Sequence, residues 1–214
     1  TAMAPAEHHP RTARMIPLIE QDVGVGDLLA TGTGVRFELG RAQYRRTDRP
    51  WDEAGSPTAT VMIGATTSEV LVEVSVKAAE PNFVPLSDAN PLDNEHPDIN
   101  SDGVQLHLTF SGNDSRPCSA SWLMVPDAKS AAVRVTGRDD AVSIPITARW
   151  RETDDGWQLL ARVERNAIGP ADSQLGLDVI VNEMPSSRER RRGQLVMSAQ
   201  NPGWAYLRGD RQEP

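Results

Sequence analysis

The chain has 214 residues, a formal net charge of −8 and a sequence pI near 5.0. This length suits one large domain, and the acidic charge argues against nucleic acid as a partner because phosphate backbones would be repelled. No stretch approaches the roughly 18 apolar residues of a transmembrane helix, and no apolar run has the character of a signal peptide. Because the chain begins with Thr1 and not with Met, we expect it to be processed or excised from a longer protein.

Residues 1–22 predict an extended N-terminal arm. The segment contains Pro5, Pro10 and Pro17 and shows no sustained hydrophobic period. Proline fixes φ and removes a backbone donor, so such a segment lies extended and needs another surface to order it. We expect the arm to cross onto a partner subunit. Its apolar anchors would be Met15, Ile16, Leu18 and Ile19.

The rest of the chain, residues 23–214, predicts a single domain built from strands. Val70, Val72, Val74 and Val76 form one apolar face, with polar residues such as Glu73 between them. This period of two is typical of half-buried antiparallel strands, and β-branched side chains favour sheet over helix. The same alternation recurs over residues 35–39, 61–63, 104–110, 121–125, 133–135, 144–150, 157–163, 175–181 and 195–197. The sequence therefore predicts an all-β fold, a mainly antiparallel two-sheet β-sandwich with less than about 15% helix.

Four blocks in the region 59–211 resemble the family 9 carbohydrate-binding modules and the related DOMON-like sandwiches. They lie at residues 60–76, 101–108, 155–163 and 175–204. The second block is the strand sequence SDGVQLHL, and the last contains LGLDVIVN followed by RGQLVMS and a Trp. The resemblance implies a carbohydrate-binding-module-like sandwich without catalytic activity.

The resemblance also implies a sugar site, which this sequence matches only in part. The family holds a sugar between two Trp rings, with polar groups at its edge. Trp204 and Asn201 match that pattern, and Gln105 stands where the family has Glu. Ile99 replaces the other Trp, and Leu123 lies where the family has Arg. An aliphatic side chain does not stack on a pyranose as an indole does, so we expect dissociation constants no better than about millimolar.

An acidic segment precedes the strand of Gln105. Asp98, Asn100 and Asp102 alternate and are followed by Gly103, as in the first half of a calcium loop, whereas the twelfth position is Thr109 and not Glu. Oxygen ligands at alternate positions can wrap a hard cation. A structural calcium and a solvated acidic loop both fit this segment.

A basic run lies near the end of the chain. Its arginines are Arg188, Arg190, Arg191 and Arg192. The run fits a solvated hairpin loop or a docking patch for an acidic partner. The catalytic motifs G-x-S-x-G, H-E-x-x-H and C-x-x-C are absent, and Cys118 is the single cysteine, so the sequence does not predict an enzyme.

Three classes of function remain. Because one Trp and one Arg of the family's sugar site are replaced, we place sugar binding second. We favour a non-catalytic interaction or structural module, an extrinsic periplasmic or extracellular subunit of a larger cell-envelope assembly. A weaker resemblance suggests the extra periplasmic domain of a bacterial photosynthetic reaction-centre complex. The alternative is a sugar-binding module attached to a polysaccharide-active protein. An enzyme is the third class.

Overall fold

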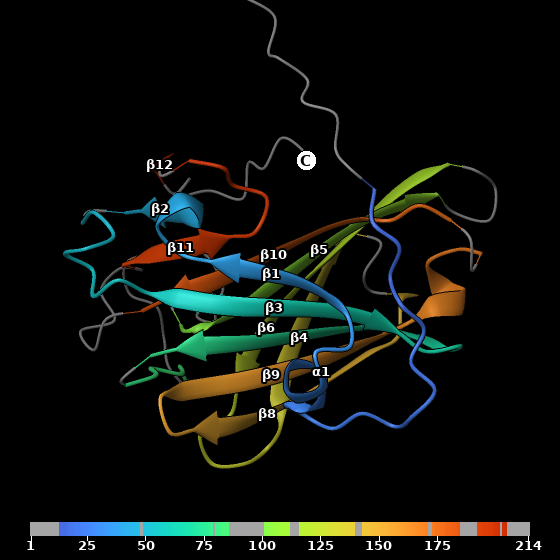
Figure 1. Ribbon diagram of the computed structural model, residues 1–214, viewed down its shortest axis with the longest axis horizontal. Helices are drawn as coiled ribbons and strands as arrows, with labels where there is room; N and C mark the ends of the chain where they lie inside the picture. Colours follow the sequence, from blue (N-terminus) through green and yellow to red (C-terminus); the bar gives the residue numbers. More distant parts are fainter. Residues whose placement is uncertain are drawn as a thin grey trace, which may run out of the picture.

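The computed structural model describes residues 13–47, 49–78, 80–85, 101–111, 116–139, 143–170, 173–184, 192–201 and 203–204. These residues form two packed sheets and confirm the predicted sandwich (Figure 1). The five-stranded sheet has the order β1 (Val35–Leu39), β3 (Thr58–Ala65), β4 (Glu69–Lys77), β9 (Gly156–Glu164) and β8 (Ile146–Thr153). The seven-stranded sheet has the order β12 (Gly203–Trp204), β2 (Tyr44–Arg46), β11 (Gly193–Val196), β10 (Gly176–Glu183), β5 (Gly103–Ser111), β6 (Pro117–Pro126) and β7 (Val133–Asp139).

The named strands pair antiparallel except for β12 and β2, which run parallel, and a single parallel bridge joins Leu18 to Ala65 of β3. The helical elements of the described chain are short: α1 (Asp27–Thr31), η1 (Arg41–Gln43) and η4 (Arg165–Ala167). The sequence pattern did not predict α1, β2 or β12, because each is too brief to develop a period. No helix among the described residues is long and apolar enough to cross a membrane.

The core lies between the two sheets, as the alternation predicts. The valines at positions 70, 72, 74 and 76 all belong to the main buried cluster, together with Trp122 and Trp157. Both indoles are almost completely buried. Large aromatic side chains account for much of the apolar area that such a core removes from water.

The N-terminal part of the chain covers the outer face of the five-stranded sheet, the face turned away from the other sheet. In Figure 1, α1 lies against this face near β9. Beneath it, Ile19, Val23 and Leu28 pack on the sheet, where they bury Met62 and Leu71. This part of the outer face is therefore a second, smaller core and not a solvated surface.

Glu73 is the clearest departure from the sequence pattern. Its place opposite the valines predicts a polar, half-buried face, yet its exposed fraction is 0%. The carboxylate accepts the backbone N–H of Leu29 at 2.8 Å and that of Gly26, so it holds the start of α1 onto the sheet. Burial raises the pKa of Glu73, and these two donors counteract the rise.

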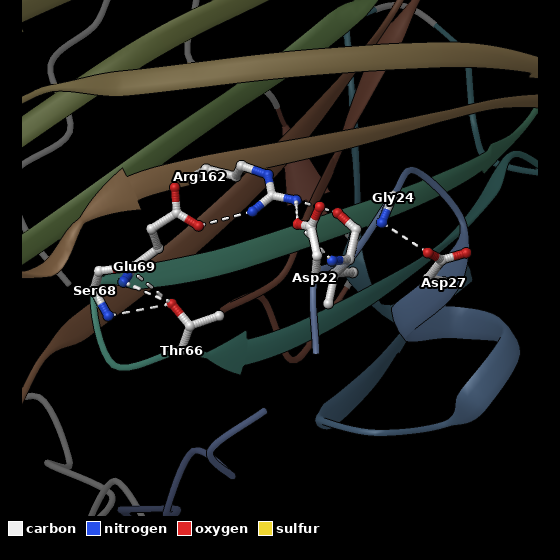
Figure 2. Close-up of polar contacts among 8 residues, drawn as sticks. Asp22, Gly24, Asp27, Thr66, Ser68, Glu69 and Arg162 are labelled. Carbon is white, nitrogen blue, oxygen red and sulfur yellow. Dashed lines mark hydrogen bonds and ion pairs between the residues drawn. The ribbon is translucent and has the colours of Figure 1, made fainter. Parts of the chain in front are cut away.

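Arg162 of β9 fixes the segment just before α1. Its guanidinium donates to Glu69 Oε2 at 2.7 Å and to Asp22 Oδ1 at 3.2 Å, and also to the carbonyl of Val23 (Figure 2). One cation thus joins strand β4 to the covering segment. Because Asp22 is exposed, its share of the ion pair adds little, and the partly buried contact with Glu69 is the stronger one.

The described part of the predicted arm lies on its own domain. Ile19 N donates to Ala65 O at 2.7 Å, and Ala65 N donates to Pro17 O at 3.2 Å, so the segment extends the end of β3. Ile19 is buried and the partly buried Ile16 packs against the main core, so these two side chains contact their own domain, and a role for them in binding a partner stays a prediction. Met15 and Leu18 are exposed by 94% and 54%, and for them partner contact stays a prediction.

Candidate functional site

Gln105 lies near the middle of the outer face of the seven-stranded sheet. In register it stands between Ile180 of β10 and Leu123 of β6. Both neighbours are buried, whereas Gln105 is only half-buried. An amide flanked by apolar side chains on a sheet face can offer hydrogen bonds next to a low-polarity surface, the combination that ligand sites use.

Two further amides join Gln105 on this face. Gln105 Nε2 donates to Asn182 Oδ1 at 2.9 Å, and Gln194 Nε2 donates to the same oxygen at 2.8 Å. The two glutamines come from strands on either side of β10, which carries Asn182. We call this set the amide cluster. It is buried at Asn182 and Gln194 and reaches solvent at Gln105.

The other predicted sugar residues lie toward the far edge of the sheet. The backbone of Trp204 pairs with β2, and the carbonyl of Asn201 accepts a hydrogen bond from Arg45 Nη1 at 2.5 Å. From β12 to β5 there are four strand spacings, a path of about 19 Å along the sheet at the usual separation. Among the contacts described, the hydrogen-bond partner of Gln105 is Asn182 of β10, and Gln194 of β11 reaches it only through that residue.

The position where the family places Arg has an apolar surrounding. Leu123 belongs to a buried cluster with Val84 and Val125, against which Phe83 also packs. Residues 83–84 therefore cover this part of the outer face with apolar side chains. A cation in place of Leu123 would lose hydration there, which agrees with an altered sugar clamp.

A second polar region lies at one end of the sandwich, around a cavity of about 240 Å³. Its walls carry Asp102, Glu183 and Arg192, with Lys77 and Glu80 also at its lining. Arg192 Nη1 donates to Glu183 Oε1 at 3.3 Å and to the carbonyl of Ala54 at 3.2 Å. Glu183 Oε2 is buried and has no hydrogen-bond partner among the described contacts.

The two carboxyl groups at this cavity bind protons more readily than free ones. Burial raises the pKa of Glu183 to about 7, with the Arg192 charge opposing and the Asp102 charge adding to the rise. Burial likewise raises the pKa of Asp102 to about 6, against the lowering effect of its backbone donors. One guanidinium neutralises at most one of the two carboxylates, so the pair keeps a proton to a higher pH than free carboxyl groups do.

Asp102 is the one predicted calcium ligand that the structure describes, and its contacts do not resemble a calcium site. Its carboxylate accepts the backbone N–H groups of Asn82 and Met184, the latter at 2.7 Å. Asp98 and Asn100 lie outside the described residues, and within the described ranges no group of three metal-binding side chains is present. Calcium binding by the whole loop stays a prediction.

The basic run is described only at its last residue. Arg192 faces the cavity and binds Glu183, so this arginine has a partner inside the domain. Arg188, Arg190 and Arg191 lie outside the described residues. Their role in docking stays a prediction.

The family resemblance led to Gln105 but did not identify Asn182 and Gln194 as the other members of the amide cluster. Asn182 alternates with the core residues Val179 and Val181 and reads as an ordinary outward-facing residue. Gln194 lies next to Gly193 in a strand of only four residues. Asn182 and Gln194 are directly opposite each other on adjacent strands. This pairing depends on how β10 and β11 align, so no pattern within either strand predicts it.

No family model matches the chain, and no curated protein matches it. Among solved structures, a family 9 carbohydrate-binding module from Caldicellulosiruptor kristjanssonii in complex with cellotriose has a TM-score of 0.55 and 14% identity, and the match covers 90% of this chain and 95% of that one. A family 9 module from the same organism in complex with glucose has a TM-score of 0.52 and 15% identity, covering 93% and 99%. The chain therefore has a fold like that of family 9 carbohydrate-binding modules, and the comparisons give no support to a reaction-centre subunit.

Proposed function

We propose that this chain is a non-catalytic carbohydrate-binding module, which takes a glucose unit or a short glucan on the outer face of its seven-stranded sheet. The sequence favoured an interaction or structural module and kept a sugar-binding module as the alternative; here the sugar-binding module comes first. Its structural support is the fold, which resembles modules in complexes with cellotriose and glucose. A periplasmic or extracellular location would suit this function, because polysaccharides are met there.

The half-exposed amide of Gln105 is the single observation that carries the proposal. It stands at the position that the family resemblance assigns to sugar recognition, and the amide cluster holds it in place. An amide offers both a donor and an acceptor, which matches the hydroxyl groups of a sugar. Contact of Trp204 and Asn201 with the sugar stays a prediction, because β12 lies four strands away from the strand of Gln105.

The expected affinity is low. Leu123 provides no cation, and its cover of apolar side chains offers no hydrogen bonds. We therefore expect dissociation constants of about 1 mM or weaker for glucose and cellotriose, or roughly 4 kcal/mol of binding free energy at best.

Titration by NMR or calorimetry with glucose and cellotriose tests the proposal. Gln105→Ala should weaken cellotriose binding about fivefold or more, the effect of losing a ligand hydrogen bond. Gln158→Ala is the matched control, since Gln158 is also a half-buried amide but lies on β9 of the opposite sheet. Absence of binding at tens of millimolar sugar, or equal losses in the two variants, would overturn the proposal.

The interaction-module interpretation keeps one specific observation in its favour. Met15 and Leu18 are large apolar side chains that the domain leaves exposed. If they contact another subunit of a cell-envelope assembly, replacing both with Ser should weaken co-purification of the partner without lowering the melting temperature. A chain that purifies alone and stays monomeric at high concentration would remove this interpretation.

A further inference from the structure

We infer that Asn182 is a positioning residue for the proposed sugar site, because its side-chain oxygen fixes the orientation of the amides of Gln105 and Gln194. Both glutamines donate through Nε2 to the same acceptor. The carbonyl oxygen of each amide is then left available, and neither accepts a hydrogen bond among the contacts described. The role in binding rests on the proposed function, whereas the orientation itself rests on these hydrogen bonds.

The burial of Asn182 supports a specific role over mere filling of space. Its exposed fraction is 1%, and its Nδ2 is buried with no hydrogen-bond partner among the described contacts. Leaving a buried donor unpaired is costly. Ile180, two residues earlier on the same face of β10, fills its place with an apolar side chain and leaves no polar atom unpaired. Retaining an amide at position 182 is reasonable if its oxygen is needed.

The arrangement sets what the ligand must provide. With their Nε2 groups engaged by Asn182, the glutamines offer carbonyl oxygens, which accept hydrogen bonds. A sugar hydroxyl is a donor that suits such an oxygen, and Gln105 presents it at the solvent-accessible end of the cluster. The inferred selectivity is for a ligand that donates a hydrogen bond to Gln105 Oε1.

Two substitutions at position 182 separate the orientation from packing. Asn182→Asp keeps a side-chain oxygen in place and offers only acceptors at neutral pH, so Gln105 should stay oriented and cellotriose binding should change by less than about twofold. Asn182→Leu has a similar size and removes the acceptor, so binding should weaken about five- to tenfold. In a Gln105→Ala background, Asn182→Leu should cause no further loss, because the effect passes through Gln105.

A measurement without sugar tests the orientation directly. The side-chain amide protons of Gln105 in the wild-type chain should exchange with water more slowly than those of Gln158, whose Nε2 makes only a 3.4 Å contact with Ser75 Oγ. Asn182→Leu should remove this protection and Asn182→Asp should keep it. The wild-type comparison holds even if a variant does not fold.

The outcomes separate this inference from the proposed function. Equal exchange at Gln105 and Gln158 would overturn the inference whether or not the chain binds sugar. Protected Gln105 protons in a chain that binds neither sugar would overturn the proposed function and the role of Asn182 in it, while leaving the orientation standing. Loss of binding in Asn182→Asp as large as in Asn182→Leu would show that Nδ2 is the donor to both glutamines, the reverse of the inferred orientation.

Discussion

Replacing Glu183 with Gln should make the domain less sensitive to pH. Glu183 lines the cavity at the end of the sandwich, and its Oε1 accepts a hydrogen bond from Arg192. Its Oε2 is buried and has no hydrogen-bond partner among the described contacts. Gln keeps an oxygen for Arg192 and removes the charge. The substitution therefore isolates the cost of ionising this side chain inside the fold.

The sign follows from the raised pKa. A carboxyl group with a folded-state pKa near 7 and an ordinary value of 4.5 binds its proton more tightly in the folded chain. Its contribution to stability is full below the ordinary value and is lost as the pH rises through 7. The whole shift corresponds to about 3 kcal/mol. Between pH 5.5 and 8.5 the loss is about 2 kcal/mol, and Asp102 shares in it because the two groups titrate as a pair.

Urea unfolding of wild type and Glu183→Gln at pH 5.5 and 8.5 measures this effect. The difference in unfolding free energy between the two proteins should shift by about 2 kcal/mol in favour of the variant at the higher pH. In thermal melts the same shift is about 4–8 °C for a domain of this size. Comparing differences at each pH cancels every other titrating group that the substitution leaves alone.

Glu164→Gln supplies the control, because Glu164 ends β9 and is exposed. At either pH its effect on the unfolding free energy should stay within about 0.5 kcal/mol, as is usual for an exposed position. A difference between wild type and Glu183→Gln that is the same at pH 5.5 and 8.5 would contradict a raised pKa for Glu183. It would mean that Glu183 ionises in the fold as easily as in water, and that the cavity does not withhold solvent from it.

Two further predictions concern the segment over the five-stranded sheet. Ile19→Ala should cost about 2–3 kcal/mol of unfolding free energy, since this side chain is 7% exposed, whereas Leu18→Ala, at 54% exposure, should cost less than about 0.5 kcal/mol; equal costs in urea unfolding would contradict the packing of the arm on its own domain. Gly26→Ala should cost about 1–2 kcal/mol because φ is 95° and a Cβ would come within 1.9 Å of Arg151 Nη2. Gly32→Ala, with φ 68° and no neighbour within 4 Å of the added Cβ, should lower the unfolding free energy by less. A lower melting temperature for Gly32→Ala than for Gly26→Ala would contradict the close packing of α1 on the sheet.

The alternating pattern of the sequence was enough to predict the longer strands and the class of fold. The valines at positions 70, 72, 74 and 76 recur with a period of two, and this period specifies both a strand and the face that it buries. The resemblance in the strand blocks led to Gln105 and to the family 9 fold, which the structural comparisons bear out at the level of the fold.

The local pattern did not predict which outer faces of the sheets are covered or which polar side chains contact one another. Alternation marks Glu73 as facing away from the core, but the chain that buries it comes from Gly26 and Leu29, more than forty residues earlier. In the same way, Asn182 meets Gln105 across a separation of 77 residues. A local pattern shows which side of a strand faces the core, but it does not show which segment covers the other side. That covering layer forms through contacts between residues far apart in the sequence, and its loop-closure entropy and packing depend on the complete fold.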